Sequence, residues 1–340
     1  MTTSHATAAR LVDRPDFGQL VRIVAAEVQL LPTWVEKDYW VVRVLQSVAG
    51  AEALRGRFVF KGGTSLSKAW RLIDRFSEDI DLLLTGPDLG PMPARSADRA
   101  HLFKAVRSAI EAGTSLRLPL DGLSEGERRR YYLRSGTHGY MRYPLAGQQL
   151  APGAASNDWL LVEAGFRGGS QPSTVATFGS YLGEYIANRP DLGQLAEGYA
   201  ADVIPIQVPV LGAERTFIEK LLAIHAAATG DLERLQARHY YDVSCLVHHA
   251  AVQQCLNDVS RLQDLLADCI VVSNKHWGAS LDPAALDLSS SPGLAPSGAI
   301  LTVLQARWRD EESLYPRGQP SLASVLGTIG ELRPRLRRSR

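Results

Sequence analysis

The residues between 58 and 84 constrain the fold more than any other segment, because they join an apolar run, a glycine pair and an acidic strand. The segment opens with FVFKGGTSLSKAW (58–70) and closes with RFSEDIDLLL (75–84). In its second part apolar side chains alternate with Asp79 and Asp81, as they do in a half-buried strand. Residues 64–72 have helical character. The predicted order is therefore strand, glycine turn, helix and acidic strand.

The glycine pair suits the binding of a phosphate chain. Gly62 and Gly63 carry no Cβ, so a triphosphate can approach their backbone N–H groups, and the start of the next helix attracts negative charge. Thr64 and Ser65 would add hydroxyl groups. Ser77 would point with the carboxylates and could contact phosphate or be modified, although capping the turn before the strand explains it more simply.

The two aspartates suit a divalent cation. Asp79 and Asp81 lie two residues apart on a strand and therefore share one face, where their charges repel. Mg2+ or Mn2+ would relieve this repulsion and bridge the carboxylates to the phosphates of an NTP. A glycine pair alone is usually only a turn, and an Asp-x-Asp pair alone is usually a solvated strand face. Their combination on an otherwise apolar strand favours a nucleotide and metal site.

A third carboxylate is a candidate metal ligand in the same site. In WLLVEAGF (159–166) the apolar side chains share one face and leave Glu163 and Arg167 on the other. Glu163 could face the metal or activate an attacking hydroxyl group. An ion pair between Glu163 and Arg167 explains the pattern equally well.

Two further charged residues lie on predicted helices in the C-terminal part. Lys220 interrupts an apolar helix at 214–228, where a buried ammonium group needs an anionic partner such as a triphosphate. A lysine on a solvated helix face needs none. Asp242 follows Arg238 by four residues, a spacing that an ordinary helix salt bridge also produces. The residues alone leave these alternatives open.

These motifs resemble those of the AbiEii/AbiGii family of nucleotidyltransferase toxins, within the DNA polymerase β-like superfamily. KGGTSLSK (61–68) and RFSEDIDL (75–82) are similar to its first motif, although more residues separate the glycines from the aspartates than in the superfamily at large. EKDYW (36–40) resembles its N-terminal helix signature. EKL (219–221) and RHYYDV (238–243) are similar to its later motifs.

The resemblance implies an α/β (α+β) fold, in which a polymerase β-like nucleotidyltransferase lobe with a mixed sheet precedes a mainly helical lobe. It implies catalytic roles for Asp79, Asp81, Lys220 and Asp242, with Asp242 at the cleft orienting Lys220 or the acceptor. It further implies a growth-arresting toxin, paired with an antitoxin encoded nearby, that transfers NMP from an NTP to RNA, with tRNA 3′ ends as the leading acceptor. Transfer to a protein hydroxyl group, or nucleotide binding without transfer, are the alternatives.

Composition agrees with a cytoplasmic protein of two lobes. A chain of 340 residues that is 45% hydrophobic can bury a substantial core. We expect a nucleotidyltransferase domain with N-terminal helices at 15–212, a helical domain at 213–333 and a basic tail at 334–340. No apolar run is typical of a signal or membrane-spanning segment, so no membrane contact is expected. The three cysteines are spaced unlike a zinc site or a disulfide framework, and we expect them in the core.

Two basic segments are candidates for contact with RNA. Arg128, Arg129 and Arg130 precede Tyr131-Tyr132, whose rings could stack on bases, although an edge strand explains this segment equally well. The arginines of the 334–340 tail could bind phosphates, but a solvated terminal run is the simpler interpretation. Further strands are expected at 131–143, 158–167 and 202–210, and helices at 20–48 with a break near Pro32, 95–112, 231–250, 253–273 and 298–310.

Overall fold

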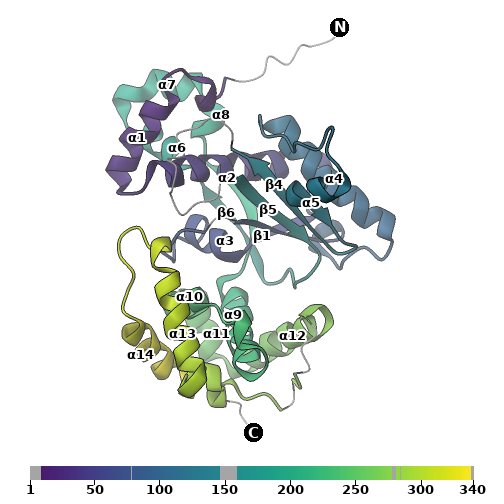
Figure 1. Cartoon of the computed structure of the whole chain (residues 1–340), viewed down its shortest axis with the longest axis vertical. Helices are drawn as coiled ribbons and strands as arrows, with labels where there is room; N and C mark the ends of the chain where they lie inside the picture. The colour runs from purple at the N-terminus through teal and green to yellow at the C-terminus, as the bar shows by residue number, and fades with distance from the viewer. Residues whose placement is uncertain (1–8, 78, 146–158, 278–280, 284, 338–340) are drawn as a thin grey trace.

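The computed structural model describes residues 9–77, 79–145, 159–277, 281–283 and 285–337. Within these residues a sheet with its covering helices forms the N-terminal lobe, and further helices form a second lobe (Figure 1). The predicted α/β class with a mixed sheet is confirmed. The sequence also suggests a flexible linker at 146–157, which lies outside the described residues.

Seven strands of the described chain form one sheet in the order β3-β4-β5-β2-β1-β7-β6. β2 is parallel to β5 and β1 is parallel to β7, whereas the other neighbours are antiparallel. The predicted strand, helix and acidic strand of the glycine motif are β1, α3 and β2. The strand bounds are β1 Phe58–Lys61, β2 Asp79–Leu84, β3 Tyr132–Arg134, β4 His138–Pro144, β5 Trp159–Gly165, β6 Ser173–Phe178 and β7 Ile206–Leu211.

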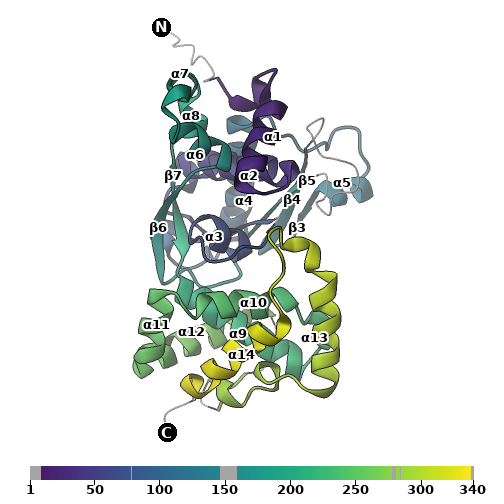
Figure 2. The ribbon, with the colours of Figure 1, turned by 90° about the vertical axis from the view of Figure 1, so that its left-hand side faces the viewer.

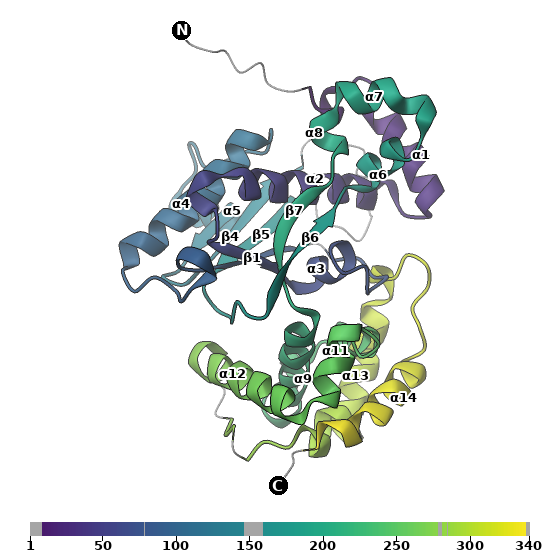
Figure 3. The same ribbon diagram turned by 180° about the vertical axis from the view of Figure 1, so that it is seen from behind.

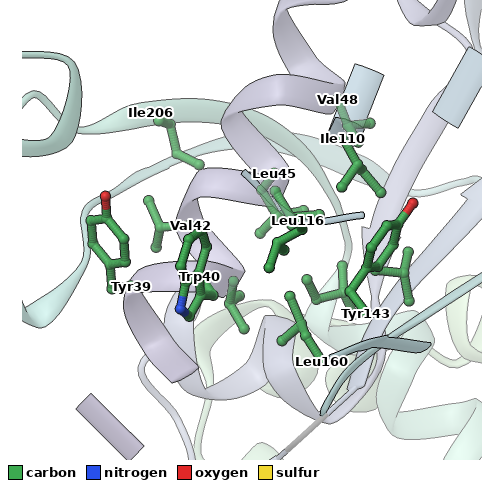
Figure 4. Close-up of a cluster of buried hydrophobic side chains, with 14 of the residues drawn as sticks. Tyr39, Trp40, Val42, Leu45, Val48, Ile110, Leu116, Tyr143, Leu160 and Ile206 are labelled. Carbon is green, nitrogen blue, oxygen red and sulfur yellow. The ribbon is translucent and has the colours of Figure 1, made fainter. Parts of the chain in front are cut away.

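Helices α2 and α4 cover one face of this sheet (Figures 1 and 3). Ile80, Leu82 and Val162 on that face belong to one hydrophobic core with these helices. Figure 4 shows part of this core, including Leu45 of α2, Ile110 of α4 and Leu160 of β5. The helices of this lobe are α1 Phe17–Val28, α2 Pro32–Gly50, α3 Gly62–Lys68, α4 Ser96–Gly113, α5 Glu125–Tyr131, α6 Tyr181–Ala187, α7 Gly193–Gly198 and α8 Ala200–Val203.

The second lobe has its own hydrophobic core. Its helices are α9 Ala213–Thr229, α10 Ala237–Leu246, α11 Ala250–Asn257, α12 Val259–Trp277, α13 Gly298–Asp310 and α14 Leu322–Leu332. Leu66 of α3 and Ile73 join this core from the N-terminal lobe, and Figure 2 shows α3 between the sheet and the helical lobe. The boundary at residue 212 stays a prediction, which this division of the cores supports.

The basic segment before Tyr131 is a helix and not an edge strand. Arg128, Arg129 and Arg130 lie in α5, which Ser124 and Glu127 cap reciprocally at its N-terminus. The rings of Tyr131 and Tyr132 are partly buried against the core of the sheet. The strand expected at 131–143 is therefore a hairpin of β3 and β4, and the rings of Tyr131 and Tyr132 pack in part against the core that lies under α2 and α4.

Other parts of the chain also differ from expectation. The strand expected at 202–210 begins only at Ile206, and the helix expected at 253–273 is divided between α11 and α12 near Asp258. Part of the expected tail is packed, because Leu336 is buried and Arg335 donates hydrogen bonds to Gln253 and Asn257. Cys255 and Cys269 are buried as expected, and Cys245 is half-buried. No helix in the described ranges combines the length and apolar character needed to cross a bilayer.

Candidate active site

Gly62 provides the space in which the Asp81 carboxylate lies. Its φ of +78° is in the left-handed region, and a Cβ built on it would stand 1.8 Å from Asp81 Oδ2. A Cβ on Gly63 would similarly stand 2.6 Å from Ser77 Oγ and 2.9 Å from Arg75 Nη2. The glycines therefore let three polar side chains close over the first turn of α3.

The hydroxyl groups beside the glycines hold the motif together. Thr64 Oγ1 donates to the carbonyl of Asp79 at 2.5 Å, and Ser65 Oγ donates to the carbonyl of Gly62 at 2.8 Å. Both side chains are buried. Ser77 is half-buried beside Gly63. The structure thus gives Thr64 and Ser65 backbone partners within the protein.

The carboxylates lie in register across adjacent strands. Lys61 of β1 is paired with Asp81 of β2, Asp81 with Glu163 of β5, and Glu163 with Tyr140 of β4. Directly paired residues share a sheet face, and side chains along a strand alternate between faces. Because Ile80, Leu82 and Val162 point into the core under α2 and α4, this row points to the other face. Asp79, two residues before Asp81, shares that face.

The electrostatics of this row show carboxylates that oppose one another. Burial raises the pKa of Asp81 to about 6, with the charge of Asp79 adding to the shift and Lys61 opposing it. Burial likewise raises the pKa of Glu163 to about 7, and the charges of Asp81 and Asp79 add to that shift. Arg167, the alternative partner of Glu163, donates through Nε to Thr137 Oγ1 at 3.3 Å. The three carboxylates therefore act on one another as a group.

This group fits a divalent cation in the type and charge of its donors. Mg2+ prefers carboxylate oxygens, and its charge would relieve the repulsion that adds to the effect of burial on both pKa values. Among the described residues, no three His, Cys, Asp or Glu side chains form a ready-made metal cluster. An open arrangement is expected for a cation that takes its remaining ligands from water and substrate phosphates.

Lys220 and Asp242 form the helical side of the site. Lys220 Nζ of α9 lies 2.7 Å from Asp242 Oδ2 of α10, and both side chains are buried. Arg75 binds the same carboxylate through Nε and Nη2, each at 2.7 Å. Burial alone would raise the pKa of Asp242, but the charges of Arg75 and Lys220 outweigh it and hold that pKa below its ordinary value. Lys220 is thus not on a solvated face, and Asp242 has Arg75 and Lys220 as its partners.

Three residues at this site were not among those predicted from sequence. Arg75 links the segment before β2 to the helical lobe through Asp242. The backbone N–H of Phe76 makes a second link, because it donates to the carbonyl of Leu314 in that lobe at 2.7 Å. Lys61 is in register with Asp81, and the charge of Arg238 acts on Asp81 from α10. Lys61 and Arg75 lie inside the predicted motif, and what the sequence lacked was strand pairing for Lys61 and packing against the helical lobe for Arg75.

The N-terminal signature at 36–40 lies in α2 and contacts the C-terminal end of α3. Asp38 Oδ1 lies 2.7 Å from Lys68 Nζ at the end of α3, and Asp38 Oδ2 accepts a hydrogen bond from the backbone of Tyr181. Lys37 Nζ lies 5.8 Å from the centre of the Phe76 ring. The signature therefore contacts the end of α3 through Asp38 and the segment before β2 through Lys37.

Glu36 in this signature gives the fold a pH dependence. It is fully buried, neither oxygen has a hydrogen-bond partner in the described part of the chain, and burial raises its pKa to about 7. A raised pKa in the folded state means that stability is retained at low pH and lost as pH rises through about 7. In denaturant titrations, the advantage of Glu36→Gln over wild type should grow by about 2 kcal/mol between pH 5 and pH 8. A constant difference across that range contradicts this prediction.

Comparison with known protein families decides the affiliation of the chain. The profile of the nucleotidyl transferase AbiEii toxins of type IV toxin–antitoxin systems matches residues 43–328. The chain belongs to the AbiEii toxin family. The matched range contains Asp79, Asp81, Glu163, Lys220 and Asp242, so both sides of the site lie within the family region.

One solved structure supports the fold of this AbiEii toxin. The nucleotidyltransferase toxin MenT4 from Mycobacterium tuberculosis has a TM-score of 0.50 and 17% identity, over 97% of this chain and 88% of that one. At this identity the likeness shows a shared fold. A protein from H. pylori described as a candidate nucleotidyltransferase has a TM-score of 0.31 and 14% identity, over 91% of this chain and 100% of that one. No curated protein matches the sequence.

Proposed function

We propose that this AbiEii toxin transfers NMP from an NTP to RNA, with the 3′ end of tRNA as the leading acceptor, in a reaction that requires Mg2+ or Mn2+. One observation carries the proposal: Asp79, Asp81 and Glu163 gather on the sheet face opposite α2 and α4, with the cation Lys220 of the other lobe acting on Asp81. A row of acids facing a buried lysine suits an NTP, which brings both negative phosphates and a metal ion.

Asp79, Asp81 and Glu163 would hold the metal. When bound, the ion neutralises phosphate charge and orients the triphosphate. The space that Gly62 and Gly63 leave is taken by the side chains of Asp81, Ser77 and Arg75, so the phosphate chain would meet these groups beside the first turn of α3, with Ser77 as a contact. Glu163, on the side of the row away from Lys61, would alternatively accept the proton of the attacking hydroxyl group.

The chemistry asked of the chain is positioning and charge stabilisation. The acceptor hydroxyl oxygen bonds to the α-phosphorus, the hydroxyl proton leaves to a base, and the bond to pyrophosphate breaks. Lys220 would neutralise charge on the departing phosphates. Asp242 and Arg75 fix the position of Lys220 through contacts of 2.7 Å.

The deciding experiment follows the α-32P label of each NTP in a mixture of tRNA and lysate proteins. We expect the label in a band that RNase removes, in the presence of Mg2+. Label that resists RNase and migrates with a protein would establish the protein acceptor, and binding without transfer of label would establish a nucleotide-binding module. Family membership implies an antitoxin partner, and we place the reaction in the cytoplasm, where the antitoxin would neutralise it.

Lys220→Ala should lower the transfer rate roughly 100- to 1000-fold and weaken nucleotide affinity, because it removes a cation aimed at phosphate. Asp242 keeps its two contacts with Arg75 in this variant, so the fold should persist. Lys220→Arg should restore little, because a planar guanidinium does not replace a compact ammonium group next to Arg75. Calorimetric titration with NTP measures the affinity. Exposed Lys104 of α4 supplies the control Lys104→Ala, and unchanged affinity and turnover in both Lys220 variants contradict the assignment.

A further inference from the structure

The row of paired residues continues past the carboxylates to an aromatic side chain. Tyr140 of β4 is paired with Glu163 and is half-buried on the same sheet face. Adjacent strands are about 4.8 Å apart, so Tyr140 lies roughly 10 Å from Asp81, about the size of one nucleotide. Neither metal binding nor phosphate binding, as proposed above, uses this ring.

Neighbouring side chains hold the Tyr140 ring and place cations beside it. The ring of His138, two residues earlier on the same face, packs edge-on against it with centroids 4.3 Å apart. Arg142, two residues later, is also half-buried on this face and donates through Nη1 to the carbonyl of Arg130 at 3.0 Å. The charges of Arg142 and Glu163 both act on the Tyr140 hydroxyl group. An aromatic ring thus stands between a carboxylate and an arginine.

Arg142 connects this face to a cationic surface at the edge of the sheet. Its contact with Arg130 ties β4 to α5, whose last turn carries three exposed arginines at 128–130. Arg134 on the edge strand β3 is paired with Gly139 and lies over the Phe103 ring of α4, so it belongs to the other face of the sheet and not to this surface. Cations therefore extend from the carboxylates across β4 to the rim, farther than a single nucleotide reaches.

We propose that Tyr140 is the platform on which the 3′-terminal base of the acceptor RNA stacks, with Arg142 and the arginines of α5 along its phosphates. Aromatic rings interleaved with cations bind single-stranded RNA by stacking and charge. The assignment rests on the function proposed above and names the acceptor side of that site. His138 acts as a positioning residue for the ring.

The position of Tyr140 in the row favours the acceptor over the base of the NTP. The groups suited to the triphosphate surround Asp81: Lys61 is paired with it, Gly62 makes room for its carboxylate, and the charge of Lys220 acts on it. Tyr140 lies beyond Glu163, on the side of the row away from these groups. Only a chain of several phosphates would use the arginines that follow. The alternative is that the base of the NTP, and not the base of the acceptor, stacks on Tyr140. The experiment below separates these two possibilities.

The test compares Tyr140→Ala and Tyr140→Phe with the wild-type protein on a tRNA acceptor. Loss of one stacked base should raise the acceptor KM roughly 5- to 150-fold in Tyr140→Ala, while NTP affinity by calorimetry stays unchanged. Tyr140→Phe keeps the ring and should stay within about twofold of wild type. Tyr185→Ala, at a half-buried tyrosine of α6, controls for loss of a ring elsewhere, and circular dichroism monitors folding.

A second acceptor makes the result specific to the terminal base. With a tRNA whose 3′-terminal nucleotide lacks its base, the wild-type protein should show a higher acceptor KM than with intact tRNA. On this abasic tRNA the acceptor KM of Tyr140→Ala should equal that of the wild-type protein. An equal KM penalty of Tyr140→Ala on both acceptors, or a weaker NTP affinity in that variant, overturns the assignment. Wild-type labelling of RNA with an unaffected Tyr140→Ala variant overturns it while leaving the proposed function intact. Failure of the wild-type protein to label RNA overturns both.

Discussion

Asp79→Asn and Asp81→Asn should each reduce metal-dependent transfer by roughly three orders of magnitude or more, while both variants remain folded. Each substitution removes a carboxylate that would ligate the metal, and an amide oxygen is a neutral and weaker ligand for Mg2+. Rates of label transfer at saturating Mg2+ and NTP measure the effect.

The fold of the Asp81→Asn variant should survive because the ionised Asp81 carboxylate weakens it. Burial and the charge of Asp79 raise the pKa of Asp81 to about 6, so the ionised group is unfavourable in the folded protein at neutral pH. Asparagine has nearly the same shape and fits the space left by Gly62. Asp81→Asn should therefore unfold at the same or a higher denaturant concentration than wild type at pH 7.

A matched control separates this effect from a general loss of negative charge. Asp121 is exposed in a turn between α4 and α5, so Asp121→Asn should transfer label as fast as wild type. EDTA should stop the wild-type reaction, and Mg2+ or Mn2+ should restore it. Full activity of either aspartate variant, or wild-type transfer that persists in EDTA, is incompatible with the metal mechanism.

Local sequence patterns predicted the elements that carry the carboxylates. The alternation in DIDLLL and in WLLVEAG identified β2 and β5, because one face of each strand packs into the core. The same alternation placed Asp79, Asp81 and Glu163 on polar faces, and the structure brings those faces together through the pairing of β2 with β5. Helix α13 at 298–310 was predicted with its observed bounds.

Local sequence patterns could not predict the register between strands or the packing between the lobes. Lys61 and Tyr140 join the row only through pairs between segments far apart in the chain. Arg75 meets Asp242 across 167 residues, a contact that no local period encodes. The helix α5 was missed although Ser124 and Glu127 show the spacing of a capping box, because the basic and aromatic residues after it favoured a strand.

Asp242→Ala should destabilise the protein by about 3–5 kcal/mol, the largest effect on stability expected at this site. The substitution leaves two buried cations, Arg75 and Lys220, without the carboxylate that both contact at 2.7 Å. Arg75 comes from the segment that docks the glycine motif on the helical lobe, so the loss acts on the contact between the lobes. Thermal and denaturant unfolding measure it, and Asp310→Ala at the exposed end of α13 is the control.

A second substitution tests whether the uncompensated charge is the cause. Arg75→Met in the Asp242→Ala background removes one of the two buried cations and fills part of its volume with an apolar side chain, so it should recover part of the lost stability. Activity should not return, because Lys220 would still lack the carboxylate that positions it. If Asp242→Ala unfolds at the wild-type denaturant midpoint, or if adding Arg75→Met destabilises it further, the buried triad does not hold the lobes together by charge pairing.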